Sequence, residues 1–345
     1  MTSAMDAYTA ESLLEVAEQA SAGATGPNAK ASLDQLESRL EELLAAMAWF
    51  VEAGRTDEAL RLANALYRFW ITKQRFTEGA ASFDRVLASP GGDELLRGRA
   101  ELNAGMMPFW MGDDARAAER FDQALETGRQ LGDAPLTSQA LGGLSRVALR
   151  TDVPEGRRLA REALAVSDAA GDEAGRSNAL HLLGVGAQIA GDLLEAREWM
   201  TQRLALVRAT GNDFLISSEA ANLAMVERQL GDLDAAEALE REALEIDART
   251  GGKFVTPFAM SGLASIARER GEFERAATLV GAAEAIMEAQ QMAWPPDERP
   301  HYERLLADLP EAMTTDAFEH ARTRGRGMSA SGAIEFALAP PASAT

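Results

Sequence analysis

Two interleaved series of glycine turns, sharing one period, run along this chain. In the first series a glycine precedes an acidic residue at Gly112, Gly191, Gly231 and Gly271; the last three are 40 residues apart, and Thr151-Asp152 stands at the one missing copy. The second series has spacings of 39, 40 and 40 residues, at Gly132, Gly171, Gly211 and Gly251. Because the two series are offset by 20 residues, they predict a helix–turn–helix unit repeated along the chain.

Each half-repeat has the pattern of an amphipathic helix. Before Gly231, for example, apolar residues recur at helical spacing, the glycine can end the helix in the left-handed conformation, and Asp232 can cap the next helix. Small residues recur where two antiparallel helices would cross: Gly105, Ala117, Gly184, Ala196, Ala224, Ala236, Ala264 and Ala276. No segment of useful length alternates apolar and polar residues with a period of two, so no strand is predicted. We therefore expect an all-α, right-handed, superhelical solenoid of tetratricopeptide type, with antiparallel helix pairs in repeats of about 40 residues rather than the usual 34.

The regularity of the pattern predicts four parts of the chain. Residues 1–92 form an N-terminal helical segment leading into the solenoid, in which residues 33–53 carry one leucine-rich helical stripe, and residues 93–292 form the regular repeats. Residues 293–338 form a C-terminal helical cap, and residues 339–345 form a disordered tail.

Composition excludes several classes of function. The chain of 345 residues has 34 Lys and Arg against 54 Asp and Glu, a net charge of −20, which opposes direct binding to nucleic acid. It has no cysteine, so disulfides and zinc–thiolate sites are excluded. The first residues lack a basic secretory n-region, and the apolar runs are too short to span a membrane. We expect a cytoplasmic protein with no membrane contact.

Motifs for catalysis and metal binding are weak. The glycine-rich stretch before Lys30 lacks the P-loop pattern, because Ala29 and Ala31 flank the lysine. The segment around Ser329 lacks the last glycine of a nucleophile elbow. The three histidines have no metal-ligand spacing: His181, His301 and His320. We therefore expect no catalytic residue, no metal site and no cofactor, and thus a protein that is not an enzyme.

Three stretches resemble the C-terminal repeat region of bacterial signal-transducing-ATPase transcriptional regulators, of the LuxR-type and winged-helix kinds. They are LDQLESRLEELLAAMAWFVEAGRTDEALRLANALYRFW, the 40-residue repeats, and the cap ERAATLVGAAEAIMEAQQMAWPPDERPHYERLLA with FEHARTRGRGMSASGAIEFAL. The resemblance extends from Tyr8 to Leu338. It implies a repeat superhelix that senses inducers or holds partner proteins, here expected without the ATPase and DNA-binding modules of that family.

The concave groove of the solenoid is the expected binding site. The first helix of each tetratricopeptide pair lines the inner surface. Residues at certain distances before the turn glycine point inward from this helix, and in this chain they are an aromatic residue and residues with amide, hydroxyl, imidazole or guanidinium groups. The ligand- or peptide-binding residues predicted in this way are Trp110, Asn178, His181, Gln188, Ser218, Arg228, Gln229 and Arg268. Such a set could hold a peptide backbone or a polar small molecule.

The predicted function is a non-enzymatic binding module, a regulatory sensor or adaptor in transcriptional or signalling control. Its expected partner is a protein or peptide, with a small-molecule inducer as an open alternative, and direct nucleic-acid binding is not expected. Two further interpretations stay open: a structural scaffold, or an accessory subunit of an enzyme or assembly complex. Self-association into a homo-oligomer also stays open.

Overall fold

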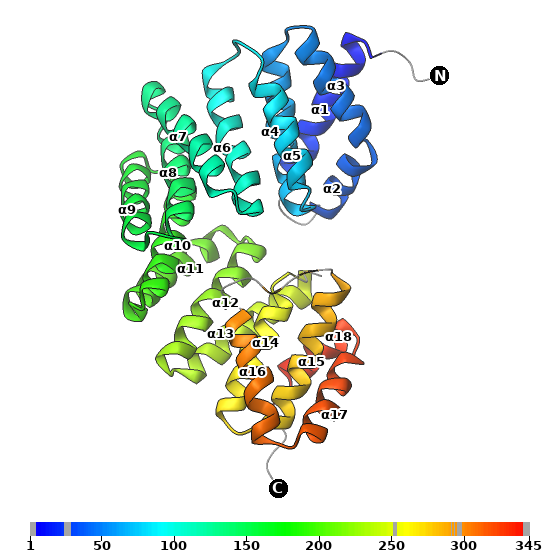
Figure 1. Cartoon of the computed structure of the whole chain (residues 1–345), viewed down its shortest axis with the longest axis vertical. Helices are drawn as coiled ribbons and strands as arrows, with labels where there is room; N and C mark the ends of the chain where they lie inside the picture. Colours follow the sequence, from blue (N-terminus) through cyan, green and yellow to red (C-terminus); the bar gives the residue numbers. More distant parts are fainter. Residues whose placement is uncertain are drawn as a thin grey trace. The chain divides into compact units, whose positions relative to one another are not determined.

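The computed structural model describes residues 5–23, 29–250, 254–290, 292, 294 and 299–340. Within these ranges the secondary structure is entirely α-helical, in eighteen helices (Figure 1). The chain divides into two compact units, unit 1 (Met1–Ala190) and unit 2 (Gly191–Thr345). In the described part of the chain, no helix combines the length and the apolar character that crossing a membrane requires.

Unit 1 contains ten helices among its described residues. Their bounds are α1 Ala7–Gly23, α2 Ala29–Ser38, α3 Leu40–Glu52, α4 Thr56–Thr72, α5 Phe76–Leu87, α6 Glu94–Met111, α7 Asp114–Leu131, α8 Ala134–Ala148, α9 Val153–Ala170 and α10 Glu173–Ala190.

Unit 2 contains eight helices among its described residues. Their bounds are α11 Leu193–Thr210, α12 Asp213–Leu230, α13 Leu233–Thr250, α14 Thr256–Glu269, α15 Phe273–Ala289, α16 Arg299–Ala312, α17 Thr315–Arg326 and α18 Ala330–Leu338.

The turn glycines end helices as the spacing predicts. Positive φ angles of 66–84° occur at Gly112, Gly132, Gly171, Gly191, Gly211, Gly231 and Gly271; Gly251 lies outside the described residues. The next helix is capped by a side chain that accepts a backbone N–H at Asp113, Asp133, Asp152, Asn212 and Asp232. Asp192 and Glu272 do not cap α11 and α15 in this way; the longer side chain of glutamate suits the N-cap position poorly.

Consecutive helices form antiparallel pairs, which confirms the predicted all-α tetratricopeptide fold. We call the first helix of each pair the A helix and the second the B helix. In unit 1 the A helix α4 packs against α6, α6 against α8 and α8 against α10, and the B helices α5, α7 and α9 each pack on their A partner (Figure 1). In unit 2, α12 packs against α14, with α13 and α15 as their B helices.

Close packing of helices depends on glycine at the crossings. The ring of Phe121 in α7 is fully buried between α6 and α8. A Cβ added at Gly105 or at Gly143 would lie 2.6 or 2.5 Å from this ring. Burying a phenylalanine contributes about 1.5–3 kcal/mol, and here the absence of two side chains makes room for it.

The leucine-rich segment 33–53 differs from the expectation of a single helical stripe. It is divided between α2 and α3, because Arg39 leaves helical geometry at φ −116° and ψ 13°. Ser38 Oγ donates to the carbonyl oxygen of Gln35, and this bond competes with the helical pattern at the break. The apolar side chains still reach one core: Leu33, Leu36, Leu40, Leu43 and Met47 are all buried.

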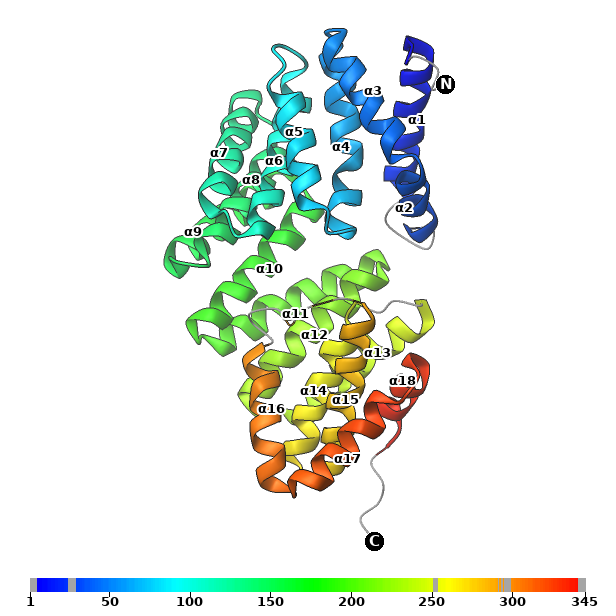
Figure 2. The ribbon, with the colours of Figure 1, turned by 45° about the vertical axis from the view of Figure 1, so that its right-hand side comes forward.

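The C-terminal part of unit 2 is helical as far as it is described. Helices α16, α17 and α18 fall within the segment expected to be a cap, and α17 lies along α15 (Figure 2). Residues 341–345, most of the segment expected to be a disordered tail, lie outside the described residues.

Candidate functional site

The A helices of unit 1 together present one surface, which we call the A face of unit 1. Its residues recur at helical spacing: Asn64 and Arg68 in α4, Arg99, Asn103 and Trp110 in α6, Gln139 and Arg146 in α8, and Asn178 in α10. Spacings of four and seven residues place side chains on the same side of a helix. Because these helices are successive neighbours, their polar side chains form one row.

Hydrogen bonds between side chains join α4 to α6 in this row. The amide of Asn103 donates from Nδ2 to Oδ1 of Asn64 over 2.9 Å. Asn64 in turn donates from its own Nδ2 to the carbonyl oxygen of Leu96 over 3.1 Å. Both asparagines are half-buried, so the pair fixes the orientation of two amides at the surface.

A second pair joins α8 to α10. The Arg146 guanidinium donates to Oδ1 of Asn178 over 2.7 Å. The absence of a side chain at Gly142 permits this arrangement, since a Cβ there would lie 2.5 Å from Nδ2 of Asn178. Gly142 thus allows the amide of Asn178 to lie against α8.

A hollow of about 190 Å³ lies between α4, α6 and α8. Its lining has amides and one guanidinium but no carboxylate: Asn64, Arg99, Leu102, Asn103, Pro135, Leu136 and Gln139. Arg99 and Gln139 are exposed there. In a chain with a net charge of −20, this lining is a local region of positive charge.

Tyr67 of α4 lies within the electrostatic influence of two other arginines of the A face, Arg68 and Arg146. Burial raises the pKa of its phenol, and the charges of Arg68 and Arg146 partly oppose that rise. The two arginines, on α4 and α8, therefore act on the same side chain.

The arrangement suits an extended polar ligand. Asparagine and glutamine amides can each donate and accept, which matches the alternating N–H and C=O groups of a peptide backbone. Guanidinium groups bind carboxylates through two parallel hydrogen bonds. The A face of unit 1 holds both kinds of group in a row crossing four helices.

Four of the residues predicted from the sequence lie in unit 1. Trp110 is 53% exposed and stacks on Phe76 with the ring centroids 6.3 Å apart. Asn178 bonds to Arg146 as described. His181 and Gln188 are half-buried on α10. Trp110 and Asn178 thus share the A face with residues that the turn offsets did not select.

The other four lie in unit 2. Ser218 is half-buried and Gln229 exposed on α12. The Arg228 side chain is only 10% exposed, and its Nε is 4.0 Å from the Glu240 carboxylate. Arg268 forms an ion pair with Asp308 of α16 over 2.6 Å. Arg228 and Arg268 are therefore engaged by acidic side chains of the chain itself. The binding role of all eight residues remains a prediction.

Sequence reasoning missed the residues that form the row on unit 1: Asn64, Arg99, Asn103, Gln139 and Arg146. Asn64 lies before the regular repeats, so no turn glycine of the series gives its offset. Arg146 precedes Thr151-Asp152, the one copy without glycine. The offset of 13 residues that selects Asn178 and Ser218 does not reach Arg146, but applied to Gly112 it would have found Arg99.

Residues 217–289 match the tetratricopeptide repeat family model. Over 114 residues the chain is 30% identical to proteins of Mycobacterium tuberculosis and Mycobacterium bovis named as HTH-type transcriptional regulators. This match covers 30% of the chain and 13% of each relative.

Solved structures share the fold. A signal transduction ATPase with a tetratricopeptide repeat sensor from Pyrococcus horikoshii aligns with 94% of this chain and 53% of its own, at 14% identity and a TM-score of 0.58. Aspartyl phosphate phosphatase F of Bacillus subtilis aligns with 93% of this chain and 84% of its own, at 13% identity and a TM-score of 0.54. A Rap protein complexed with competence and sporulation factor aligns over 87% and 96%, at 14% identity and a TM-score of 0.53.

Proposed function

We propose that this chain is a regulatory binding module whose unit 1 holds an extended peptide segment of a partner on its A face. The observation that carries the proposal is the row of oriented amides and guanidinium groups on four A helices, in which the Asn103–Asn64 bond joins α4 to α6 and the Arg146–Asn178 bond joins α8 to α10.

The asparagines and the arginines of the A face recognise different groups of the ligand. Asn64, Asn103 and Asn178 are positioned to hydrogen-bond the backbone of the segment, while Arg99 and Arg146 favour a carboxylate on it. The hollow beside Asn103 is large enough for one or two side chains of the ligand. Oriented groups cost little entropy to fix on binding, which favours affinity.

The regulatory part of the proposal is supported by the partial match to HTH-type transcriptional regulators. The Rap structure adds support, since it shares the fold and was solved in complex with competence and sporulation factor. We place the module in transcriptional or signalling control in the cytoplasm, acting by binding rather than by catalysis. Because one structural neighbour is named an aspartyl phosphate phosphatase, we also expect no release of phosphate when the chain is incubated with an aspartyl phosphate.

The test uses a phage-displayed library of linear peptides of roughly ten residues, which span about 33 Å when extended. Peptides selected on the full chain are synthesised and titrated against purified protein by calorimetry. Asn103→Ala and Arg99→Ala are each expected to weaken binding on the order of tenfold, or about 1.4 kcal/mol.

Arg85→Ala is the matched control, because Arg85 is also an exposed arginine but lies on the B helix α5. It should leave affinity unchanged. Equal affinity for all variants, or failure of the full chain to enrich any peptide, would contradict the proposed site.

A further inference from the structure

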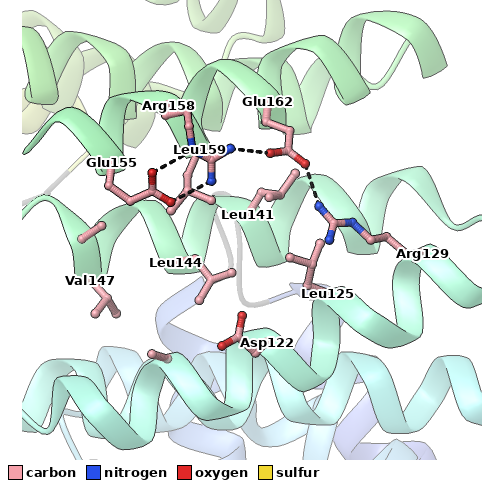
Figure 3. Close-up of a pocket in the computed structure, with 12 residues that line it drawn as sticks. Asp122, Leu125, Arg129, Leu141, Leu144, Val147, Glu155, Arg158, Leu159 and Glu162 are labelled. Carbon is pink, nitrogen blue, oxygen red and sulfur yellow. Dashed lines mark hydrogen bonds and ion pairs between the residues drawn. The ribbon is translucent and has the colours of Figure 1, made fainter. Parts of the chain in front are cut away.

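A groove of about 360 Å³ lies on the opposite side of unit 1, between the B helices α7 and α9 and over the A helix α8 (Figure 3). Its floor is apolar, formed by Leu125, Leu141, Leu144, Val147, Ala148 and Leu159. Ion pairs lie along one rim: Arg129 pairs with Glu162 over 2.7 Å, and Arg158 pairs with Glu162 over 3.0 Å and with Glu155 over 2.7 Å. At the other rim Asp122 points toward the groove (Figure 3) and forms no ion pair with any described residue.

Unit 2 has a groove of the same kind, and there a helix of the chain itself fills it. There the short helix α18 packs on the B helices α13 and α15 and on the A helix α14 (Figure 2). Its buried side chains are small: Ala333 is 2% exposed and Ala337 is not exposed at all. A groove between consecutive B helices of this fold therefore accepts a short helix.

Two arginines hold the C-terminal end of α18 in that groove. Arg275 of α15 donates to the carbonyl oxygens of Ala337 and Ala339, each over 2.8 Å. Arg241 of α13 donates to the carbonyl oxygen of Leu338. These carbonyls carry the negative end of the helix dipole and need donors, and the two cations satisfy both requirements.

The equivalent positions in unit 1 are acidic. Arg241 lies nine residues after the N-cap Asp232 of α13, and Asp122 lies nine residues after the N-cap Asp113 of α7. Arg275 likewise lies three residues after Glu272, at the N-cap of α15. Glu155 lies three residues after Asp152, the N-cap of α9. Both Asp122 and Glu155 line the groove. Glu155 is paired with Arg158, whereas Asp122 forms no ion pair with a described residue. The position that carries the cation Arg241 in unit 2 therefore carries an unpaired carboxylate in unit 1.

We propose that the α7–α9 groove of unit 1 binds a short amphipathic helix of a partner protein that places a basic C-terminal end beside Asp122. Small apolar side chains of this helix cover the leucine floor, as Ala333 and Ala337 of α18 do in unit 2. Charge complementarity with the unpaired Asp122 carboxylate selects the occupant. A second copy's α18 is disfavoured, because it would bring helix carbonyls against this carboxylate.

The test uses two stapled peptides, since an isolated helix as short as α18 is marginal in water. The α18 probe has the sequence of residues 329–339 with a free carboxyl terminus. The basic probe has the changes Leu338→Lys and Ala339→Lys and an amidated terminus. Binding to the full chain is measured by fluorescence anisotropy. The basic probe is expected to bind on the order of tenfold more tightly than the α18 probe.

The double variant Asp122→Arg/Glu155→Arg should reverse this preference, because it gives unit 1 the charges that hold α18 in unit 2. The charge-matched control Glu119→Arg/Glu173→Arg changes exposed acids that do not line the groove, and it should keep the wild-type preference. Asn103→Ala should also leave binding of the basic probe unchanged, which separates this site from the A face. Equal binding of both probes, absence of binding, or a preference that the groove variant does not change would overturn the proposal.

Discussion

Gly325 of α17 lies directly against the carbonyl oxygen of Thr278 in α15, where an added Cβ would come within 1.9 Å of that oxygen. Because the atoms that would clash with this Cβ belong to the backbone of α15, no flexible side chain can move aside to make room. We expect Gly325→Ala to lower the free energy of unfolding by about 1–3 kcal/mol, measured by urea denaturation of the full chain.

Gly327 offers a matched control two residues further on. A Cβ there would lie 3.5 Å from the nearest atom, an ordinary contact, and its backbone is not in the left-handed region. Gly327→Ala should change the midpoint of unfolding little. An equal loss of stability in both variants would show that α17 does not depend on this close crossing.

Glu284 joins three segments of unit 2. Its carboxylate is 4% exposed and accepts hydrogen bonds from the Tyr302 hydroxyl over 2.6 Å, from Arg322 Nε over 2.9 Å and from Arg326 over 2.9 Å. Because hydrogen bonds to a charged group contribute about 1.5–3 kcal/mol, Glu284→Gln should lower unfolding stability at neutral pH by that amount. Tyr302→Phe removes one of the bonds and should cost less. A larger loss for Tyr302→Phe would contradict the central role of the carboxylate.

Glu284 also makes the free energy of unfolding depend on pH in the acid range. Burial alone would raise the pKa of Glu284, but the bonds from Arg322, Tyr302 and Arg326 outweigh it and hold the pKa below the ordinary value of 4.5. Its contribution is therefore complete above about pH 4.5 and is lost as pH falls through the lower, folded-state value. The difference between wild type and Glu284→Gln should shrink in acid. A difference independent of pH would contradict this linkage.

Asp247 of α13 caps α14 from a distance. Its buried carboxylate accepts from the Thr256 backbone N–H over 3.0 Å and from the Thr256 hydroxyl over 2.9 Å, while α14 has no side-chain cap at its own N-cap Val255. Asp247→Ala is expected to cost about 0.5–2 kcal/mol. Asp247→Asn keeps an acceptor and should cost less, so equal losses would exclude capping as the cause.

The pH dependence at Asp247 has the opposite sign to that at Glu284. Burial raises the pKa of Asp247 above its ordinary value of 3.8, and the bonds from Thr256 and Val255 oppose the rise without cancelling it. The folded state therefore binds this proton more tightly than the unfolded state, and protonation favours folding as pH falls through the folded-state value. Relative to Asp247→Asn, wild type should gain stability in mild acid, and a relative loss there would contradict the raised pKa.

The turns could be predicted from the sequence because they are local. A glycine at a fixed period specifies the left-handed end of one helix, and the following Asp supplies the cap of the next at Gly231-Asp232, although not at Gly191-Asp192. The break at Arg39 escaped prediction because the leucine stripe continues across it. A periodic pattern reports which side chains are buried, not whether the backbone between them is continuous.

The candidate site was harder to predict, because it depends on contacts between helices. Asn103 and Asn64 are 39 residues apart, and Arg146 and Asn178 are 32 apart. Their pairing depends on how neighbouring helices are aligned, which propensity and periodicity do not encode. The opposite charges at Asp122 and Arg241 emerge only when the two grooves are compared.

The most direct test of the proposed peptide site is photo-crosslinking to the selected peptide. Benzoylphenylalanine replaces Gln139, which is exposed in the hollow of the A face, or Arg85, which is exposed on α5. We expect a crosslinked peptide with the label at position 139 and none at position 85. Asn103→Ala should reduce the yield at position 139. Crosslinking only at position 85, or at neither position while calorimetry still detects binding, would contradict the assignment of the ligand to the A face of unit 1.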